Sequence, residues 1–144
     1  MSGLFGIKAS PLIDVNLILQ IAIIIILIVG RRLVKNKKLL THGRLMAILV
    51  ILHSVAIALI MIPSFLINFS ALRSIFDPRV IITWIHAIVG TSAEALGIYL
   101  VSKWRFKPQS VAACAKRRKY MIPAFTLWGL SAMLGIFFYA LYYL

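Results

Sequence analysis

The chain has 144 residues, of which 62% are hydrophobic and only 13% are charged. A soluble domain could not hide this much apolar surface behind so little polar surface, so we expect an integral membrane protein. Sixteen Lys and Arg against three acidic residues give a formal net charge of +13. Because the basic residues form short runs between apolar segments, they indicate membrane topology and exclude a nucleic-acid partner.

Four apolar segments are long enough to cross a hydrocarbon core of about 30 Å at a rise of about 1.5 Å per residue. They cover residues 12–29, 45–69, 80–101 and 121–144. This pattern predicts an all-α polytopic membrane protein, in which residues 1–144 form a single four-transmembrane-helix bundle.

Local signals agree with these boundaries. Ser10 before Pro11 and Asp77 before Pro78 each fit an N-cap followed by the first residue of a helix. Pro63 falls late in the second segment and is expected to kink the helix or to end its regular part.

The basic residues predict an orientation. Residues 30–44 and 102–120 hold most of them, so the positive-inside rule places these two loops in the cytoplasm and both termini outside a plasma membrane. Clusters of this density also attract anionic lipid headgroups. The residues expected to contact such lipids are Arg31, Arg32, Lys35, Lys37, Lys38, Lys116, Arg117, Arg118 and Lys119.

Two ionisable residues lie at matching depth on the second and third segments. His53 is about 12 Å and Glu94 about 10 Å from the cytoplasmic ends of their helices, at 1.5 Å per residue. Because an unpaired charge inside a bundle is costly, we predict an interhelical His53–Glu94 pair.

His86 lies about 9 Å from the outer end of its helix, near the depth of Asn16 and Gln20. Its depth differs from that of His53 by about 9 Å in a 30 Å core. Two axial ligands of one haem must flank the same macrocycle, so His53 and His86 are poor partners for a single haem.

Small residues predict close helix packing around these polar groups. Gly90 shares a helix face with Glu94, and two further pairs have small-xxx-small spacing. These pairs, which could form internal contacts or docking sites for other subunits, are Ser54 with Ala58 and Ser131 with Gly135.

The sequence carries no pattern typical of an enzyme. Asp14, Asp77 and Glu94 lie far apart along the chain. The chain also lacks a glycine-rich phosphate loop, a paired-cysteine metal motif and a serine nucleophile elbow. We therefore expect no catalytic residues and no resident cofactor or metal.

Several spacings nevertheless resemble a known family. They are His42-Gly-Arg-Leu-Met in the second segment, His86 followed by Gly97-Ile98-Tyr99 in the third, and Trp128, Gly135 and Tyr139 in the fourth. Over residues 40–144 the chain thus resembles the CtaM/YozB-like membrane proteins, four-span proteins associated with maturation of haem A and copper terminal oxidases. Where that family tends to have a histidine before the last helix, this chain has Arg117.

The resemblance implies a non-catalytic accessory subunit or assembly factor of a respiratory-type copper/haem membrane oxidoreductase. A terminal oxidase is the first expected host and a copper membrane monooxygenase the second, with other integral membrane subunits as partners. The alternative is a small redox or metal-handling protein that binds haem or copper transiently. In that case His42 and His86, carried over by resemblance, and His53 would be the ligands.

Overall fold

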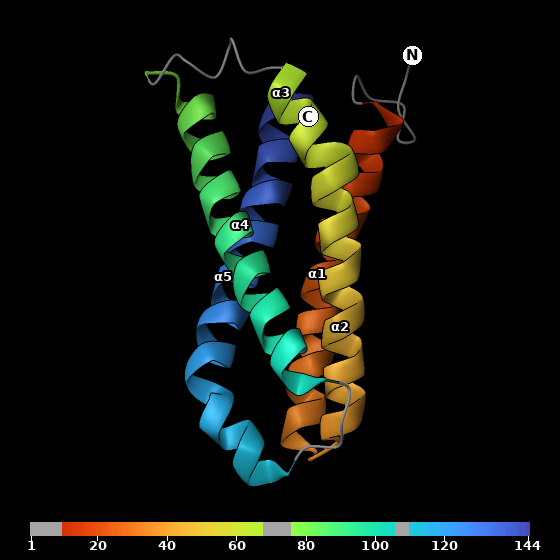
Figure 1. Cartoon of the computed structure of the whole chain (residues 1–144). Coiled ribbons are helices and arrows are strands. Elements are labelled where there is room, and N and C mark those ends of the chain that lie inside the picture. Colours follow the sequence, from red (N-terminus) through yellow and green to blue (C-terminus); the bar gives the residue numbers. More distant parts are fainter. Residues whose placement is uncertain (1–9, 68–75, 106–109) are drawn as a thin grey trace.

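The structure, a computed structural model, describes residues 10–67, 76–105 and 110–144. These residues form helices throughout, with no strand among them. In chain order the elements are α1 (Pro11–Lys35), α2 (Leu39–Ala56), the π-helical turn η1 (Ile57–Met61), α3 (Ile62–Ile67), α4 (Pro78–Trp104) and α5 (Val111–Tyr143). Figure 1 shows α2, η1 and α3 as one continuous rod beside the rods of α1, α4 and α5.

Among the described residues, four helical rods are long and apolar enough to cross a membrane: α1, the rod from α2 to α3, α4 and α5. The predicted all-α, four-span membrane fold is therefore confirmed. The last two residues of the predicted second span, 68 and 69, lie outside the described residues.

The helices begin where local chemistry favours a start. Pro11 follows Ser10 at the first position of α1, although the Ser10 side chain makes no capping bond. Asp77 caps α4 as predicted, since its Oδ1 accepts a hydrogen bond from the Arg79 backbone N–H at 2.9 Å. Ser110 caps α5 in the same way, accepting from the Ala113 N–H at 3.2 Å.

The prediction that residues 30–44 and 102–120 are loops is wrong for most of their length. α1 continues to Lys35, α2 already begins at Leu39, and α5 begins at Val111, well before residue 121. Lys and Arg are good helix formers, so basic residues extend these helices beyond the apolar segments. Between α1 and α2 only a tight turn remains, in which Lys37 adopts a left-handed φ of 57°. Residues 106–109 lie outside the described part of the chain.

Pro63 disturbs its helix as predicted, and the irregularity lies on its N-terminal side. Proline lacks an N–H, and its ring clashes with the carbonyl four residues earlier, which here belongs to Leu59. The chain accommodates this through η1, a π-helical turn immediately before the turn that contains Pro63.

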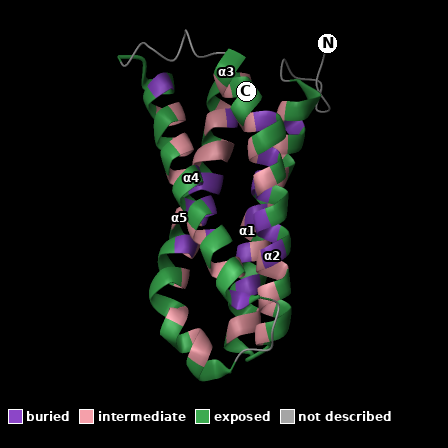
Figure 2. Cartoon of the chain, in the orientation of Figure 1, coloured by how far each residue is buried: buried purple, intermediate pink, exposed green. Residues whose placement is uncertain are grey.

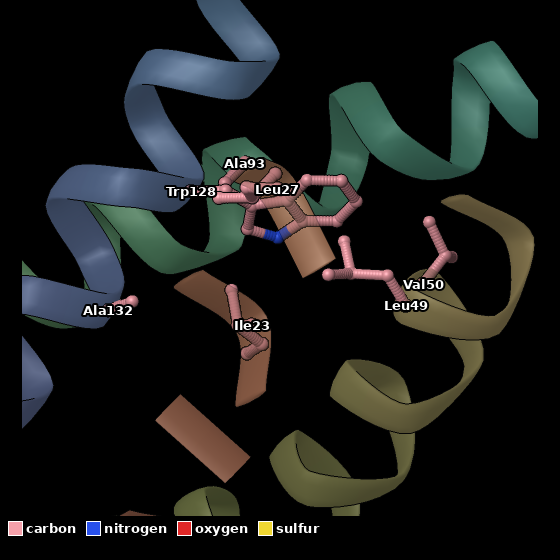
Figure 3. Packing of buried hydrophobic residues seen from close by; sticks show 7 residues of the cluster. All are labelled: Ile23, Leu27, Leu49, Val50, Ala93, Trp128 and Ala132. Atoms are coloured by element: carbon pink, nitrogen blue, oxygen red, sulfur yellow. The ribbon is translucent and has the colours of Figure 1, made fainter. Parts of the chain in front are cut away.

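All four rods contribute to one narrow core. α4 packs most extensively on α5, α1 packs on both α2 and α5, and α2 packs on α4. Buried residues follow the inward faces of the rods, whereas exposed residues cover their outward faces (Figure 2). Figure 3 shows the apolar centre of this core, which consists of Ile23, Leu27, Leu49, Val50, Ala93, Trp128 and Ala132.

The two ends of the bundle differ in charge. The turn from α1 to α2, the end of α4 and the start of α5 lie together at the bottom of Figure 1. We call this the basic end, because it carries Arg31, Arg32, Lys35, Lys37, Lys38, Lys116, Arg117, Arg118 and Lys119. The starts of α1 and α4 and the end of α5 lie at the other end, which we call the Asp14 end.

Candidate functional site

A buried ionisable pair joins α2 to α4. Nδ1 of His53 lies 2.7 Å from Oε2 of Glu94, and the two residues are 2% and 7% exposed. The hydroxyl of Ser54 donates to the other carboxylate oxygen of Glu94. The structure therefore brings together the two residues whose matching depth predicts a pair. Ser54, predicted only as a small packing residue, completes the hydrogen bonding of the carboxylate.

Trp128 of α5 covers this pair. Its indole Nε1 lies 3.4 Å from Nδ1 of His53, and the two rings meet edge to face at an interplanar angle of 87°. Gly97 makes this position possible, because a Cβ there would lie 2.5 Å from Cη2 of Trp128. We call His53, Ser54, Glu94 and Trp128 the paired cluster; its carboxylate oxygens both have hydrogen-bond partners.

A second polar group lies closer to the Asp14 end. We call Asn16, Gln20, His86 and Ser131 the open cluster, because several of their buried polar atoms have no hydrogen-bond partner among the described residues. Gln20 and Ser131 are each only 1% exposed. The unpartnered atoms are Oδ1 of Asn16, Nε2 and Oε1 of Gln20, Nδ1 of His86 and Oγ of Ser131.

Glycines hold the open cluster together. A Cβ at Gly135 would lie 3.1 Å from Cδ of Gln20 and 3.2 Å from Cε1 of His86, so α1 and α4 bring both side chains against one point of α5. A Cβ at Gly90 would lie 3.0 Å from Oγ of Ser131. The small residues Gly90, Ser131 and Gly135 thus lie at internal contacts.

Ala58 differs from the other small residues. It lies in η1 and is exposed, whereas Ser54 contacts Glu94 inside the bundle. The spacing of Ser54 and Ala58 therefore does not form an internal packing pair within this chain. The π-helical turn begins at Ile57, before Ala58, so Ala58 does not keep the regular α-helical spacing from Ser54.

A third polar contact lies at the Asp14 end. The hydroxyl of Tyr139 donates to Oδ1 of Asp14 at 2.6 Å, and Asp14 is 0% exposed. This bond between α1 and α5 was not predicted from the sequence. A signal for it exists, since Asp14 is an acidic residue just inside the first apolar segment and needs a partner there.

The three histidines lie at three different levels. His42 is at the basic end, where its Nδ1 donates to the Gly30 carbonyl at 3.0 Å. On α2, His42 and His53 are separated by about 17 Å at 1.5 Å per residue. On α4, His86 and the Glu94 that binds His53 are separated by about 12 Å by the same rise.

These positions do not fit one haem or copper site. Within the described part of the chain, no three His, Cys, Asp or Glu side chains converge as metal ligands would. His42 lies far from His53 along α2, whereas His53 is close enough to His86 for an electrostatic interaction between the two side chains.

The predicted lipid-contact residues lie at the basic end, on helix ends and the tight turn between α1 and α2 (Figure 1). Most of them are exposed, and Arg117 is half-buried. Their positions on α1, on α5 and in the turn after α1 form a positively charged rim around one end of the bundle, a surface that suits anionic headgroups.

Several of the residues that carry the family resemblance make contacts between helices. His42 binds Gly30, a Cβ at Gly97 would collide with Trp128, and Tyr139 binds Asp14. Their shared property here is thus helix packing. No protein-family model matches the chain, and comparisons with curated proteins and with solved structures give no match.

Proposed function

We propose that this chain is a non-catalytic accessory subunit or assembly factor of a multi-subunit respiratory-type copper/haem membrane oxidoreductase. A terminal oxidase is the first host and a copper membrane monooxygenase the second, in a plasma membrane with the basic end in the cytoplasm. One observation carries the proposal. The histidines, together with Glu94 and Asp14, bind or pack against helices of the same chain at separate levels, which suits a scaffold better than a ligand set.

The outward faces supply the surface that such a subunit needs. Large apolar side chains are exposed along every rod, among them Ile25, Leu59, Ile88 and Met133. Helices that are apolar on their outward faces are suited to lipid or to helices of other subunits. Other integral membrane subunits are therefore the proposed partners, with anionic lipids at the basic end.

The test is isolation of the tagged full chain from its native membrane in a mild detergent, followed by identification of the co-purifying chains and metal analysis. We expect subunits of one copper or haem oxidoreductase in fixed proportion to this chain. Recovery of a lone monomer, or of unrelated chains in varying amounts, would contradict the proposal. The Gly129→Ala variant is a suitable control, because the added Cβ meets nothing within 4 Å.

The alternative function is that of a small redox or metal-handling protein, with haem or copper bound transiently through His42, His53 or His86. One observation favours a role for His86, since its Nδ1 is buried without a hydrogen-bond partner among the described residues. If this alternative holds, the purified chain alone is expected to contain stoichiometric metal or to show a haem absorption spectrum, and His86→Ala is expected to abolish it. A spectrum without haem and a metal content near zero would leave the accessory role as the better account.

A further inference from the structure

We infer that polar side chains along the bundle axis form a hydrated path through which a proton from the Asp14 end reaches the His53–Glu94 pair. The inference does not rest on the accessory role and can be tested on the chain alone. It starts from the open cluster, whose unpartnered atoms the packing of this chain does not explain.

The polar side chains follow one another in order along the bundle. Asp14 and Tyr139 form the level nearest the end. Gln20 and His86 come next, both against Gly135, which is one helical turn from Tyr139 on α5. Ser131 follows one turn further along α5, and Trp128 at the paired cluster comes after it.

The spacing of these levels suits bridging water. One helical turn advances about 5.4 Å, and a water that makes two hydrogen bonds of about 2.8 Å spans about the same distance. The Gln20 amide and the Ser131 hydroxyl can each donate and accept, as a hydrogen-bonded path requires. Because burial of such groups without partners costs free energy, bridging water stabilises them where they lie.

The open cluster comes nearest to the Glu94 carboxylate along α4. On α4, Glu94 lies one turn from Gly90, whose missing side chain leaves room for Ser131. The path therefore leads from Ser131 to the carboxylate along this face of α4.

The path ends at the paired cluster. On the side toward the basic end, Leu27 and Leu49 pack with Trp128 in the apolar core. His42 lies beyond these side chains, next to Gly30. A proton that reaches Glu94 from the Asp14 end consequently meets apolar side chains instead of a continued polar path, so the pair stores the proton and does not conduct it across the membrane.

The proton balance is simple. With a neutral His53 and an ionised Glu94, the pair carries one negative charge; one proton taken from water, on either residue, makes it neutral, and no electron moves. The groups that face Glu94 are His53 and Ser54 from α2 and Trp128 from α5. Along α1 and α4, the first acidic or basic residues on the Asp14 side of the pair are Asp14, which is bound to Tyr139, and His86. The first on the basic side are Arg31 and Lys103, toward the basic ends of the two helices.

The experiment uses the full chain in lipid vesicles and infrared difference spectroscopy after a pH step on one side of the membrane. Infrared bands are assigned to the His53–Glu94 pair when they disappear in the Glu94→Gln variant. We expect them to respond quickly to a step on the Asp14 side and at least about tenfold more slowly to a step on the basic side, a ratio that reflects the cost of moving a proton past apolar side chains.

Two variants test the path itself. Gln20→Leu removes both amide atoms, and Gly135→Ala pushes a methyl group against Gln20 and His86, so each is expected to slow the response from the Asp14 side about tenfold or more. Gly129→Ala adds the same methyl group to α5 without a contact and is expected to leave the rate unchanged. If Gly135→Ala does not fold, Ser131→Ala replaces it.

Three results would overturn the inference. The first is a pair that shows no infrared change at any accessible pH. The second is an equal response from both sides, and the third is a Gln20→Leu variant that folds and responds at the rate of the unmodified chain.

Discussion

The paired cluster and the open cluster lie in the same bundle and are built from the same kinds of residue, yet they satisfy their polar groups differently. Glu94 has a partner at each carboxylate oxygen, from His53 and Ser54. Gln20 is more deeply buried and has no partner for either amide atom among the described residues. Inside lipid, polar groups turn inward and pair, so a cluster that does not pair is where water or a ligand is expected.

The difference also separates two uses of a polar side chain. A pair that is fully hydrogen-bonded holds two helices together, and removal of one partner leaves the other buried and unsatisfied. An unpartnered amide contributes little to helix association. Its role is instead to bind water or to take part in proton transfer. The comparison therefore predicts large stability effects in one cluster and small ones in the other.

The largest effect is expected for His53→Leu, which leaves the Glu94 carboxylate with Ser54 alone. Leaving a buried carboxylate without its partner in this way costs about 3–5 kcal/mol of unfolding free energy. The double variant His53→Leu with Glu94→Leu is expected to recover most of this loss, because no charge is then left unpaired. Unfolding in mixed detergent micelles measures both values. A double variant as unstable as the single one would show that the pair does not act as a unit.

A somewhat smaller effect is expected for Tyr139→Phe, which removes the hydroxyl that donates to Asp14. A hydrogen bond to a charged group contributes about 1.5–3 kcal/mol, so the same unfolding assay is expected to show a loss in that range. Tyr142→Phe, on the same helix, provides the control. If both variants lose equal stability, the Asp14 bond adds nothing beyond interfacial packing.

Gly97→Ala tests how tightly Trp128 covers the pair. The added Cβ would lie 2.5 Å from the indole and 3.0 Å from Val50, and overpacking of a core costs about 1–3 kcal/mol. Displacement of the indole is expected to change the fluorescence of Trp128 as well. Gly129→Ala, which meets no neighbouring atom within 4 Å, is expected to be neutral in both measurements.

The smallest effect is expected for Gln20→Leu. This change removes two buried polar atoms that have no partner among the described residues and replaces them by an apolar group of similar size. Such replacements are close to neutral, so the change in unfolding free energy is expected to stay within about 1 kcal/mol. A loss of several kcal/mol would mean that the open cluster holds the helices together as firmly as the paired cluster.

The fold could be predicted from the sequence because the membrane imposes a strong constraint. The lengths of the apolar segments, the cap at Asp77 and the proline at the start of α1 depend on local chemistry alone, so they locate the helices well. The His53–Glu94 pair could be predicted because depth in an antiparallel bundle follows from residue counting. The helical state of the basic runs was missed, because the charge pattern marks the membrane boundary and not the end of a helix.

Other features of the site depend on how the helices rotate against one another. Depth places Gln20 near His86, but only the packing of α1 and α4 on Gly135 shows that both meet there. Neither the covering of His53 by Trp128 nor the bond of Tyr139 to Asp14 follows from counting, since each joins helices distant in the sequence. That the Gln20 amide has no hydrogen-bond partner among the described residues likewise follows only from the positions of all its neighbours.

The π-helical turn η1 has a geometric consequence for the end of the second rod. A π turn holds one residue more than an α turn, so it rotates everything after it by about 100° about the helix axis. In α3 no described residue is buried, yet the ring of Phe65 meets that of Trp84 edge to face with centroids 5.1 Å apart. Deletion of one residue from Ile57–Met61 would reset this angle and turn Phe65 away from α4, while the rest of the bundle keeps its register.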